Sequence, residues 1–172
     1  MMYTKFIGIS CLFGFSILFS RQITGKIKSK LVELEEINKV LNDFIISINI
    51  GLYDVKFLIK EAIKTTKTQY HDFLIGVNKD MDKKDVNDFS LIWFENLNHH
   101  KLNITLEEKI ILENIGVSLS LNDKNRMIKQ LTLAQTSLED KIKKAKEDKE
   151  TKVSLYEKMG VLFGSFLVII FI

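Results

Sequence analysis

The chain has 172 residues and a formal net charge of +3, and it contains no proline. Its length allows one compact domain besides two apolar ends. Arginine is the side chain best suited to bidentate contacts with bases and phosphates, and it occurs only at Arg21 and Arg126, so the composition argues against a nucleic-acid partner. Because proline is absent and glycines are few, little interrupts long helices, and the composition predicts an all-α protein.

An uncharged apolar run lies at each end of the chain. The first covers residues 6–19, and the second covers residues 159–172, within the apolar tail 156–172. Each run is short for a bilayer span, which takes roughly 20 residues, but Tyr156 and a snorkelling Lys158 suit a membrane interface. We therefore predict a transmembrane anchor at residues 1–21 and a transmembrane or re-entrant anchor at residues 156–172, with interfacial insertion as the alternative.

The N-terminal run leaves further alternatives open. A basic residue, an apolar run and small residues are also features of a cleavable signal peptide, but Leu18-Phe19-Ser20 places the large Leu18 where a cleavage site before Arg21 needs a small residue. Cys11 is the single cysteine, so no intrachain disulfide can form, and too little apolar sequence precedes it for a typical lipoprotein signal. An uncleaved anchor is the favoured interpretation.

Basic residues gather between the two runs, whereas only Lys5 lies outside them. They follow the first run at Arg21, Lys26, Lys28 and Lys30 and precede the second at Lys141, Lys143, Lys144, Lys146, Lys149, Lys152 and Lys158. The positive-inside rule then predicts a cell-membrane protein whose main domain lies in the cytoplasm.

Residues 22–138 carry apolar side chains at helical spacing, which predicts an antiparallel bundle of roughly six helices. The predicted apolar faces comprise Ile27, Leu31, Leu34, Ile37, Leu41, Phe44 and Ile48; Val55, Phe57, Leu58, Ile59 and Ile63; Tyr70, Phe73, Leu74 and Val77; Phe89, Ile92, Trp93 and Leu97; Ile111, Leu112, Ile115 and Leu119; and Ile128, Leu131, Leu138, Ile142 and Ala145. Helix boundaries are expected at Gly51, at the caps Asp54 and Asp123, and at the capping box that begins with Thr105.

No catalytic or metal motif is found, so we predict no cofactor and no enzyme activity. Asp80 and Asp82 resemble the start of a calcium loop within the loop-like stretch 78–88, but the glycine and glutamate of that motif are missing. His99 and His100 are adjacent and have no ligand one helical turn away, so a solvated turn is expected. The carboxylates Glu33, Glu35 and Glu36 lie in a stretch with lysines on either side and are predicted to lie on the surface.

Residues 139–152, within a predicted stalk that covers residues 139–155, are nearly all charged, with opposite charges four residues apart. Such pairs contribute about 0.2–0.5 kcal/mol each, enough to support a solvated helical stalk. The alternative is a docking face for a charged partner or an anionic lipid, formed by Lys141, Lys144, Asp148 and Lys152.

Small residues recur at a spacing of four in both apolar runs, at Ser10 and Gly14 and at Gly160 and Gly164. This spacing lets helix backbones approach closely in lipid. We predict that the two ends pack together, within one molecule or between neighbours.

The pattern as a whole resembles the stage III sporulation protein AB family of endospore-forming bacteria. The resemblance lies in Tyr156-Glu157-Lys158-Met159-Gly160 running into Gly164, in Trp93 with Leu97, and in Leu112, Ile115-Gly116, Leu119 and Asp123. Where a proline-leucine turn is expected in the family, this chain has Gly51-Leu52.

The resemblance implies a subunit of the channel complex that links mother cell and forespore, placed on the mother-cell side of the outer forespore membrane. Its helical part would be similar to the platform domains of type II secretion systems. It would dock the sporulation ATPase, subunit AA, and contact other channel subunits and membrane lipid. Formation of a homo-oligomer is a further option that the sequence leaves open. The alternative function is a sensory or signalling membrane protein with a helical cytoplasmic domain.

Overall fold

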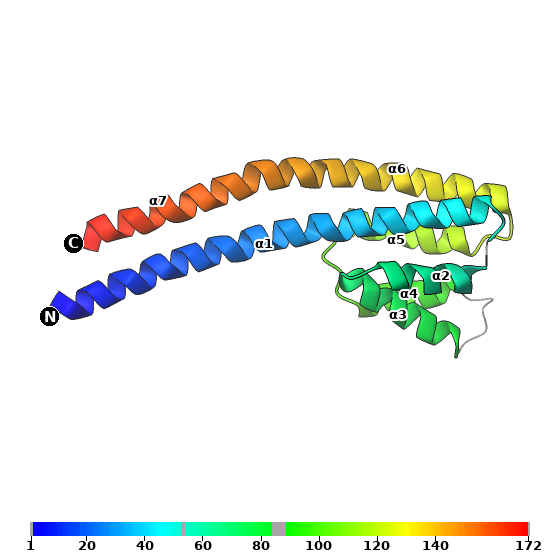
Figure 1. Cartoon of the computed structure of the whole chain (residues 1–172), viewed down its shortest axis with the longest axis horizontal. Coiled ribbons are helices and arrows are strands. Elements are labelled where there is room, and N and C mark those ends of the chain that lie inside the picture. Colours follow the sequence, from blue (N-terminus) through cyan, green and yellow to red (C-terminus); the bar gives the residue numbers. More distant parts are fainter. Residues whose placement is uncertain (1, 53, 84–88, 172) are drawn as a thin grey trace. The chain divides into compact units, whose positions relative to one another are not determined.

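A computed structural model describes residues 2–52, 54–83 and 89–171, and every element in these ranges is helical (Figure 1). The elements in chain order are α1 (Met2–Asn49), α2 (Val55–Thr65), α3 (Gln69–Met81), α4 (Phe89–His99), α5 (Leu106–Leu119), α6 (Lys124–Asp148), a π-helical stretch η2 (Lys149–Val153) and α7 (Ser154–Phe171). The predicted all-α class is confirmed for these residues.

The chain divides into two compact units. Unit 1 consists of Met1–Leu31 and Lys144–Ile172, and unit 2 consists of Val32–Lys143. Helices α1 and α6 each contribute residues to both units, so no linker of coil separates them.

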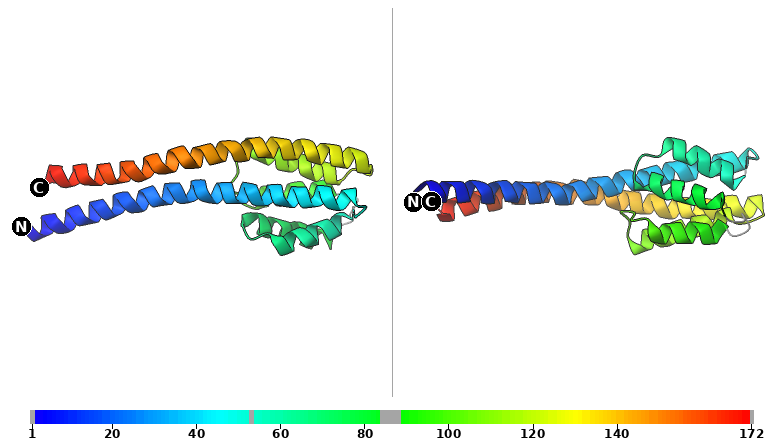
Figure 2. Two further views of the ribbon diagram at one scale, coloured as in Figure 1. Left: turned by 45° about the horizontal axis from the view of Figure 1, so that its top comes forward. Right: turned by 90° about the horizontal axis from the view of Figure 1, so that it is seen from below.

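Unit 2 contains the main hydrophobic core. Helices α2, α3, α4 and α5 pack in sequence order, each against the next (Figure 2). Most of the predicted apolar positions are buried, among them Leu34, Ile37, Leu41, Phe44, Ile48, Leu58, Ile59, Tyr70, Phe73, Leu74, Val77, Ile92, Trp93, Leu112, Ile115, Leu131 and Leu138. Full burial of a large apolar side chain contributes about 1.5–3 kcal/mol.

The helix boundaries follow the predicted signals. Gly51 has φ +95° and ends α1, with its N–H donating to Ile48 O and the Leu52 N–H donating to Ser47 O at 2.9 Å. This pair of bonds is a Schellman motif, which glycine adopts without steric cost. The capping box at Thr105 is present, with the Glu108 side chain accepting from the Thr105 N–H. Both predictions are confirmed.

Some predicted positions differ from the structure. Phe57, expected on a buried face, is 41% exposed, whereas Glu33, expected on the surface, is buried. The loop predicted for 78–88 begins later, because α3 continues to Met81 and the turn begins at Asp82. Residues 84–88 lie outside the described part of the chain.

Unit 1 is helical wherever it is described. The charged segment predicted as a stalk continues from α6 through η2 into α7 without a loop. Among the described residues, none of the helices is both long enough and apolar enough to cross a membrane. The transmembrane anchors predicted at residues 1–21 and 156–172 stay a prediction, because many side chains of both segments lie outside the described part of the structure.

Candidate functional site: a groove between α1 and α2

Two carboxylates one turn apart on α1 hold the loops of unit 2. Glu36 accepts hydrogen bonds from Lys67 N at 3.0 Å, from Thr68 N at 3.0 Å and from Thr68 Oγ1 at 2.9 Å. Glu33 Oε2 accepts from Asn103 N at 3.2 Å. These bonds fasten the α2–α3 loop and the loop before α5 to the same helix, so both carboxylates are structural.

Glu33 is the more unusual of the pair because only 1% of it is exposed and its Oε1 has no hydrogen-bond partner among the described residues. Burial raises its pKa, the Asn103 N–H opposes that rise, and the charges of Glu36 and Glu108 add to it. A buried carboxylate near other carboxylates favours its protonated form. The surface position predicted for Glu33 is wrong, because the lysines on either side of this stretch do not indicate that Glu33 is buried.

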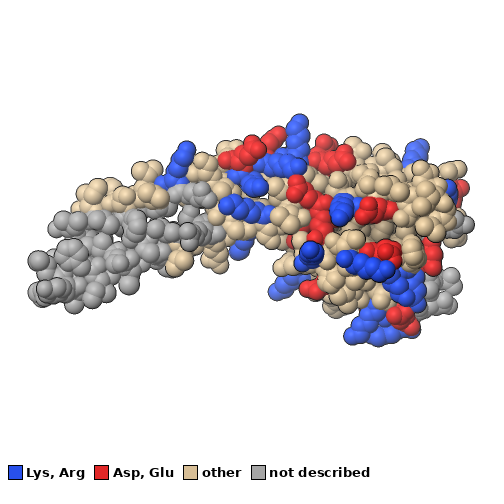
Figure 3. All heavy atoms as spheres, viewed as in Figure 1, with Lys and Arg blue, Asp and Glu red and all other residues tan. Residues whose placement is uncertain are grey.

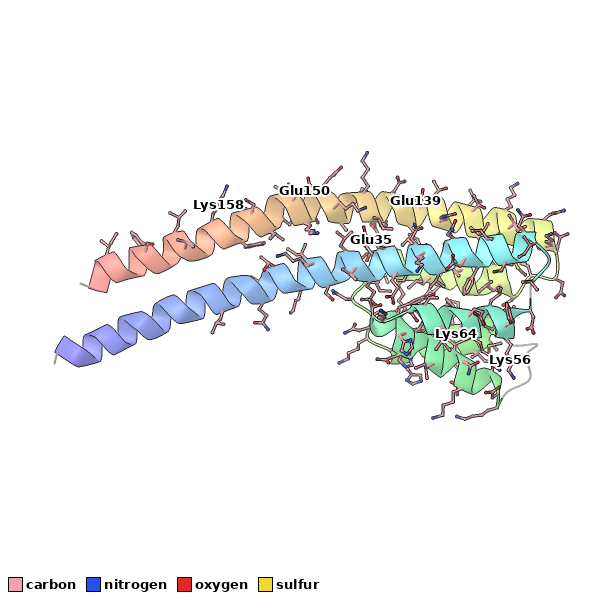
Figure 4. The ribbon with its side chains drawn as sticks, viewed as in Figure 1. Glu35, Lys56, Lys64, Glu139, Glu150 and Lys158 are labelled. Carbon is pink, nitrogen blue, oxygen red and sulfur yellow. The ribbon has the colours of Figure 1, made fainter. Side chains whose placement is uncertain are left out.

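The predicted docking residues on α6 and η2 are partly engaged within the chain. Lys141 pairs with Glu107 of α5, and this hydrogen bond raises the pKa of Lys141. Lys152 pairs with Asp148 at 2.9 Å, four residues earlier. Lys144 is exposed, as are Glu139 and Glu150, labelled in Figure 4. A docking role for Lys141, Lys144, Asp148 and Lys152 stays a prediction.

The predicted packing residues Ser10, Gly14, Gly160 and Gly164 have side-chain surroundings outside the described part of the structure. Their segments belong to the same unit, because unit 1 joins Met1–Leu31 with Lys144–Ile172. Close packing of the four residues stays a prediction as well.

The histidines of unit 2 have structural neighbours. His71 Nδ1 lies 3.1 Å from Thr66 Oγ1, and the His100 ring packs edge-on against Phe73 with centroids 6.2 Å apart. His100 is thus partly packed, whereas a solvated turn was expected. Within the described residues, no three His, Cys, Asp or Glu side chains are grouped so that they could hold a metal ion.

Unit 2 has a groove of about 360 Å³ between the C-terminal half of α1 and α2. Its floor consists of four buried apolar side chains, Val40, Phe44, Leu58 and Ala62. These residues face each other because both helices repeat apolar positions every three or four residues. The groove is therefore an apolar trough built on two core helices.

Large apolar side chains remain exposed along the rim of the groove. Ile46 is 52% exposed, Leu52 48% and Phe57 41%. Ile50, in the turn directly after α1, is 70% exposed and does not line the groove. The Schellman turn at Gly51 sets Leu52 at the rim, because the left-handed residue turns the chain back across the end of α1. An exposed apolar patch with a polar border marks an interaction site.

Both charged residues that line the groove are acidic. Asp43 on α1 is half-buried and makes no ion pair with any described residue, whereas Glu61 on α2 pairs with Lys64, labelled in Figure 4. Elsewhere on the face seen in Figure 3, basic and acidic side chains are interspersed. The groove thus combines an apolar floor with an uncompensated negative charge.

A model of the stage III sporulation protein AB family matches residues 5–172. The chain belongs to this family. Comparisons with curated proteins and with solved structures gave no match. Membership connects the protein with sporulation, and the resemblance expected from the sequence is confirmed.

Two of the residues that carry the family resemblance meet in the core of unit 2. Gly116 of α5 lies so close to the Trp93 ring that an added Cβ would stand 2.3 Å from Trp93 Cδ1. Trp93 Nε1 donates to Leu112 O at 2.8 Å and holds the ring there. These residues close the α4–α5 contact and have a packing role.

The groove itself was missed at the sequence level. Phe57 was assigned to a buried face because its spacing fits α2, and Ile46 and Ile50 were not singled out. The signal that could have indicated an exposed apolar surface was the pair Ile46 and Ile50, which are four residues apart and lie off the main apolar stripe of this segment.

Proposed function

We propose that this protein is a structural scaffold in the sporulation channel between mother cell and forespore, and that unit 2 docks a cytoplasmic secretion-type ATPase. The α1–α2 groove supports this proposal most directly, because it offers a binding surface of exposed apolar side chains on a rigid helical core. Family membership supports the connection with sporulation.

The chemistry of unit 2 fits binding better than catalysis. Glu33 and Glu36 hold loops, and the Trp93 indole N–H is bonded within the core. A catalytic carboxylate or histidine needs to face a substrate site, whereas these groups face the protein interior or a loop backbone.

We also propose that the apolar ends hold the chain at a lipid bilayer, with unit 2 in the cytoplasm on the mother-cell side of the outer forespore membrane. The uncharged runs and the lysines beside them support membrane attachment. Flotation of membranes washed with carbonate tests it: the full chain should float with the lipid, and a Leu162→Lys/Phe166→Lys variant should float less. Recovery of the wild-type chain in the wash would contradict membrane attachment.

Packing of the two ends through Ser10, Gly14, Gly160 and Gly164 is part of this proposal. Replacing Gly160 and Gly164 by leucine should weaken crosslinking between the ends while unit 2 stays folded. Crosslinking that does not change would contradict it.

Co-purification tests the scaffold proposal. The full-length protein is solubilised from sporulating cells in mild detergent at low salt and recovered through an affinity tag, and the sporulation ATPase is quantified in the eluate. We expect the ATPase to be retained by the wild-type chain and lost from a variant that lacks residues 32–143. Absence of the ATPase from the wild-type eluate would contradict the docking role.

A further inference from the structure

We infer that the α1–α2 groove binds an amphipathic helix of a partner protein whose apolar stripe is bordered by lysine or arginine. This inference goes beyond the proposed function, because it specifies the chemistry of the partner segment and does not depend on which protein carries it.

The shape of the groove favours a helix as the occupant. Two helices, α1 and α2, form the walls, and the floor residues Phe44 and Leu58 are buried between them. A third helix can lay an apolar stripe into such a trough with side chains at i, i+3, i+4 and i+7. The exposed rim residues Ile46 and Phe57 would lose contact with water when it binds.

The negative charge of the groove indicates which residues should border the apolar stripe of the partner helix. Asp43 lines the groove without an ion pair among the described residues, and Glu61 is the second charged lining residue. Glu61 is bonded to Lys64, so Asp43 is the charge in the groove lining that has no ion pair among the described residues. Complementarity across an interface therefore requires a basic group opposite Asp43.

The same charges disfavour a second copy of this chain as the occupant. A two-fold symmetric contact brings the same patch of both copies together. Such a contact would bring the unpaired Asp43 carboxylates of both copies into one interface, and like charges oppose it. A partner with a different, basic surface avoids this repulsion.

A defined probe tests the inference. A fluorescent synthetic helical peptide carries leucines at i, i+3, i+4 and i+7 with a lysine on each border, and a matched peptide carries glutamates in place of the lysines. Binding to the full-length protein in lipid nanodiscs is followed by fluorescence anisotropy. We expect the lysine peptide to bind at least tenfold more tightly than the glutamate peptide.

Variants of the groove locate the binding. Asp43→Lys should weaken binding of the lysine peptide about tenfold and make the protein prefer the glutamate peptide. The reason is that the substitution reverses the charge of the side chain that faces the border of the peptide. Ile46→Asp should weaken the binding of both peptides. The matched controls are Glu113→Lys, a half-buried carboxylate in the middle of α5, and Leu133→Asp, an exposed leucine on α6, and both should bind as the wild type does.

Three results would overturn the inference: equal affinity for the two peptides, equal effects of groove and control variants, or self-association that Ile46→Asp abolishes in the absence of peptide. A failure of ATPase co-purification would leave the peptide result intact, so the two proposals fail separately.

Discussion

The α4–α5 contact and the α1–α2 groove are both helix pairs in unit 2, yet one is closed and the other open. At α4–α5, Gly116 leaves no room for even one additional carbon atom beside the Trp93 ring. Between α1 and α2 there is a groove with a volume of about 360 Å³, and the side chains of Ile46 and Phe57 at its rim are exposed. Closely packed helices stabilise the fold, whereas the open pair leaves apolar surface available for a partner.

The difference separates residues that maintain the fold from residues that we assign to binding. Trp93 is fully buried, bonded through Nε1 and packed edge-on against Phe73 with ring centroids 4.8 Å apart. Asp43 and Ile46 have no comparable network. Substitutions should therefore affect stability at the closed pair and binding at the open pair.

The largest loss of stability is expected from Gly116→Ala. The added methyl group would overlap the Trp93 ring, and the hydrogen bond to Leu112 O prevents the ring from moving aside. Overpacking of this kind costs about 1–3 kcal/mol. Urea unfolding of the full chain followed by circular dichroism measures it.

Gly25→Ala is the matched control for this substitution. Gly25 also lies inside a helix, but an added Cβ meets nothing within 4 Å. Alanine is favoured over glycine in a helix by about 0.5–1 kcal/mol, so the control should be slightly stabilised. Equal unfolding midpoints for the two variants would contradict the closed contact.

Gly51→Ala should destabilise the protein less than Gly116→Ala and should also affect the groove. Its φ of +95° is strained for any residue with a Cβ, at a cost of about 1–2 kcal/mol. Because Gly51 places Leu52 at the rim, we also expect weaker peptide binding. The same urea titration and anisotropy experiments measure both, and loss of stability with unchanged binding would show that Leu52 does not shape the groove.

Glu33→Gln tests the buried carboxylate through its pH dependence. The pKa of Glu33 is raised above the ordinary value of 4.5, so its ionised form is disfavoured in the folded state. Protonated Glu33 makes its full contribution to the free energy of unfolding at pH values below 4.5. That contribution is lost as the pH rises through the pKa of Glu33 in the folded state. A glutamine does not ionise, so the variant should be more stable than wild type at pH 7.5, and the advantage should decrease toward pH 4.5.

Glu36→Gln is the control for the pH experiment, since Glu36 accepts hydrogen bonds from the backbone of Lys67 and Thr68 as a carboxylate. This variant should be less stable than wild type at pH 7.5. If Glu33→Gln unfolded at a lower urea concentration than wild type at pH 7.5, the assignment of Glu33 as a disfavoured charge would be wrong.

The smallest effects on stability are expected at the groove. Asp43→Lys and Ile46→Asp should each change the free energy of unfolding by less than about 0.5 kcal/mol, because they alter exposed or half-buried positions outside the core. The urea midpoint measures this. A loss comparable to that of Gly116→Ala would show that the groove belongs to the core.

Most helices of unit 2 could be predicted from the sequence because their signals are local. The Thr105 capping box and Gly51 each mark a boundary within a few residues, and the stripe through Leu34, Ile37 and Leu41 has helical period. The burial of Glu33 could not be predicted, since it depends on Asn103, seventy positions later in the chain. The groove also depends on how α1 and α2 meet, which periodicity does not specify.

Amide hydrogen exchange of the full-length protein in nanodiscs, with and without the purified sporulation ATPase, tests the central claim most directly. That claim is that unit 2 is a docking scaffold whose open face is the α1–α2 groove. We predict that the ATPase slows exchange over residues 40–65, which include the groove, and leaves α4 and α5 unchanged. Slower exchange confined to other helices would contradict the groove as the docking face, and no change anywhere would contradict the scaffold itself.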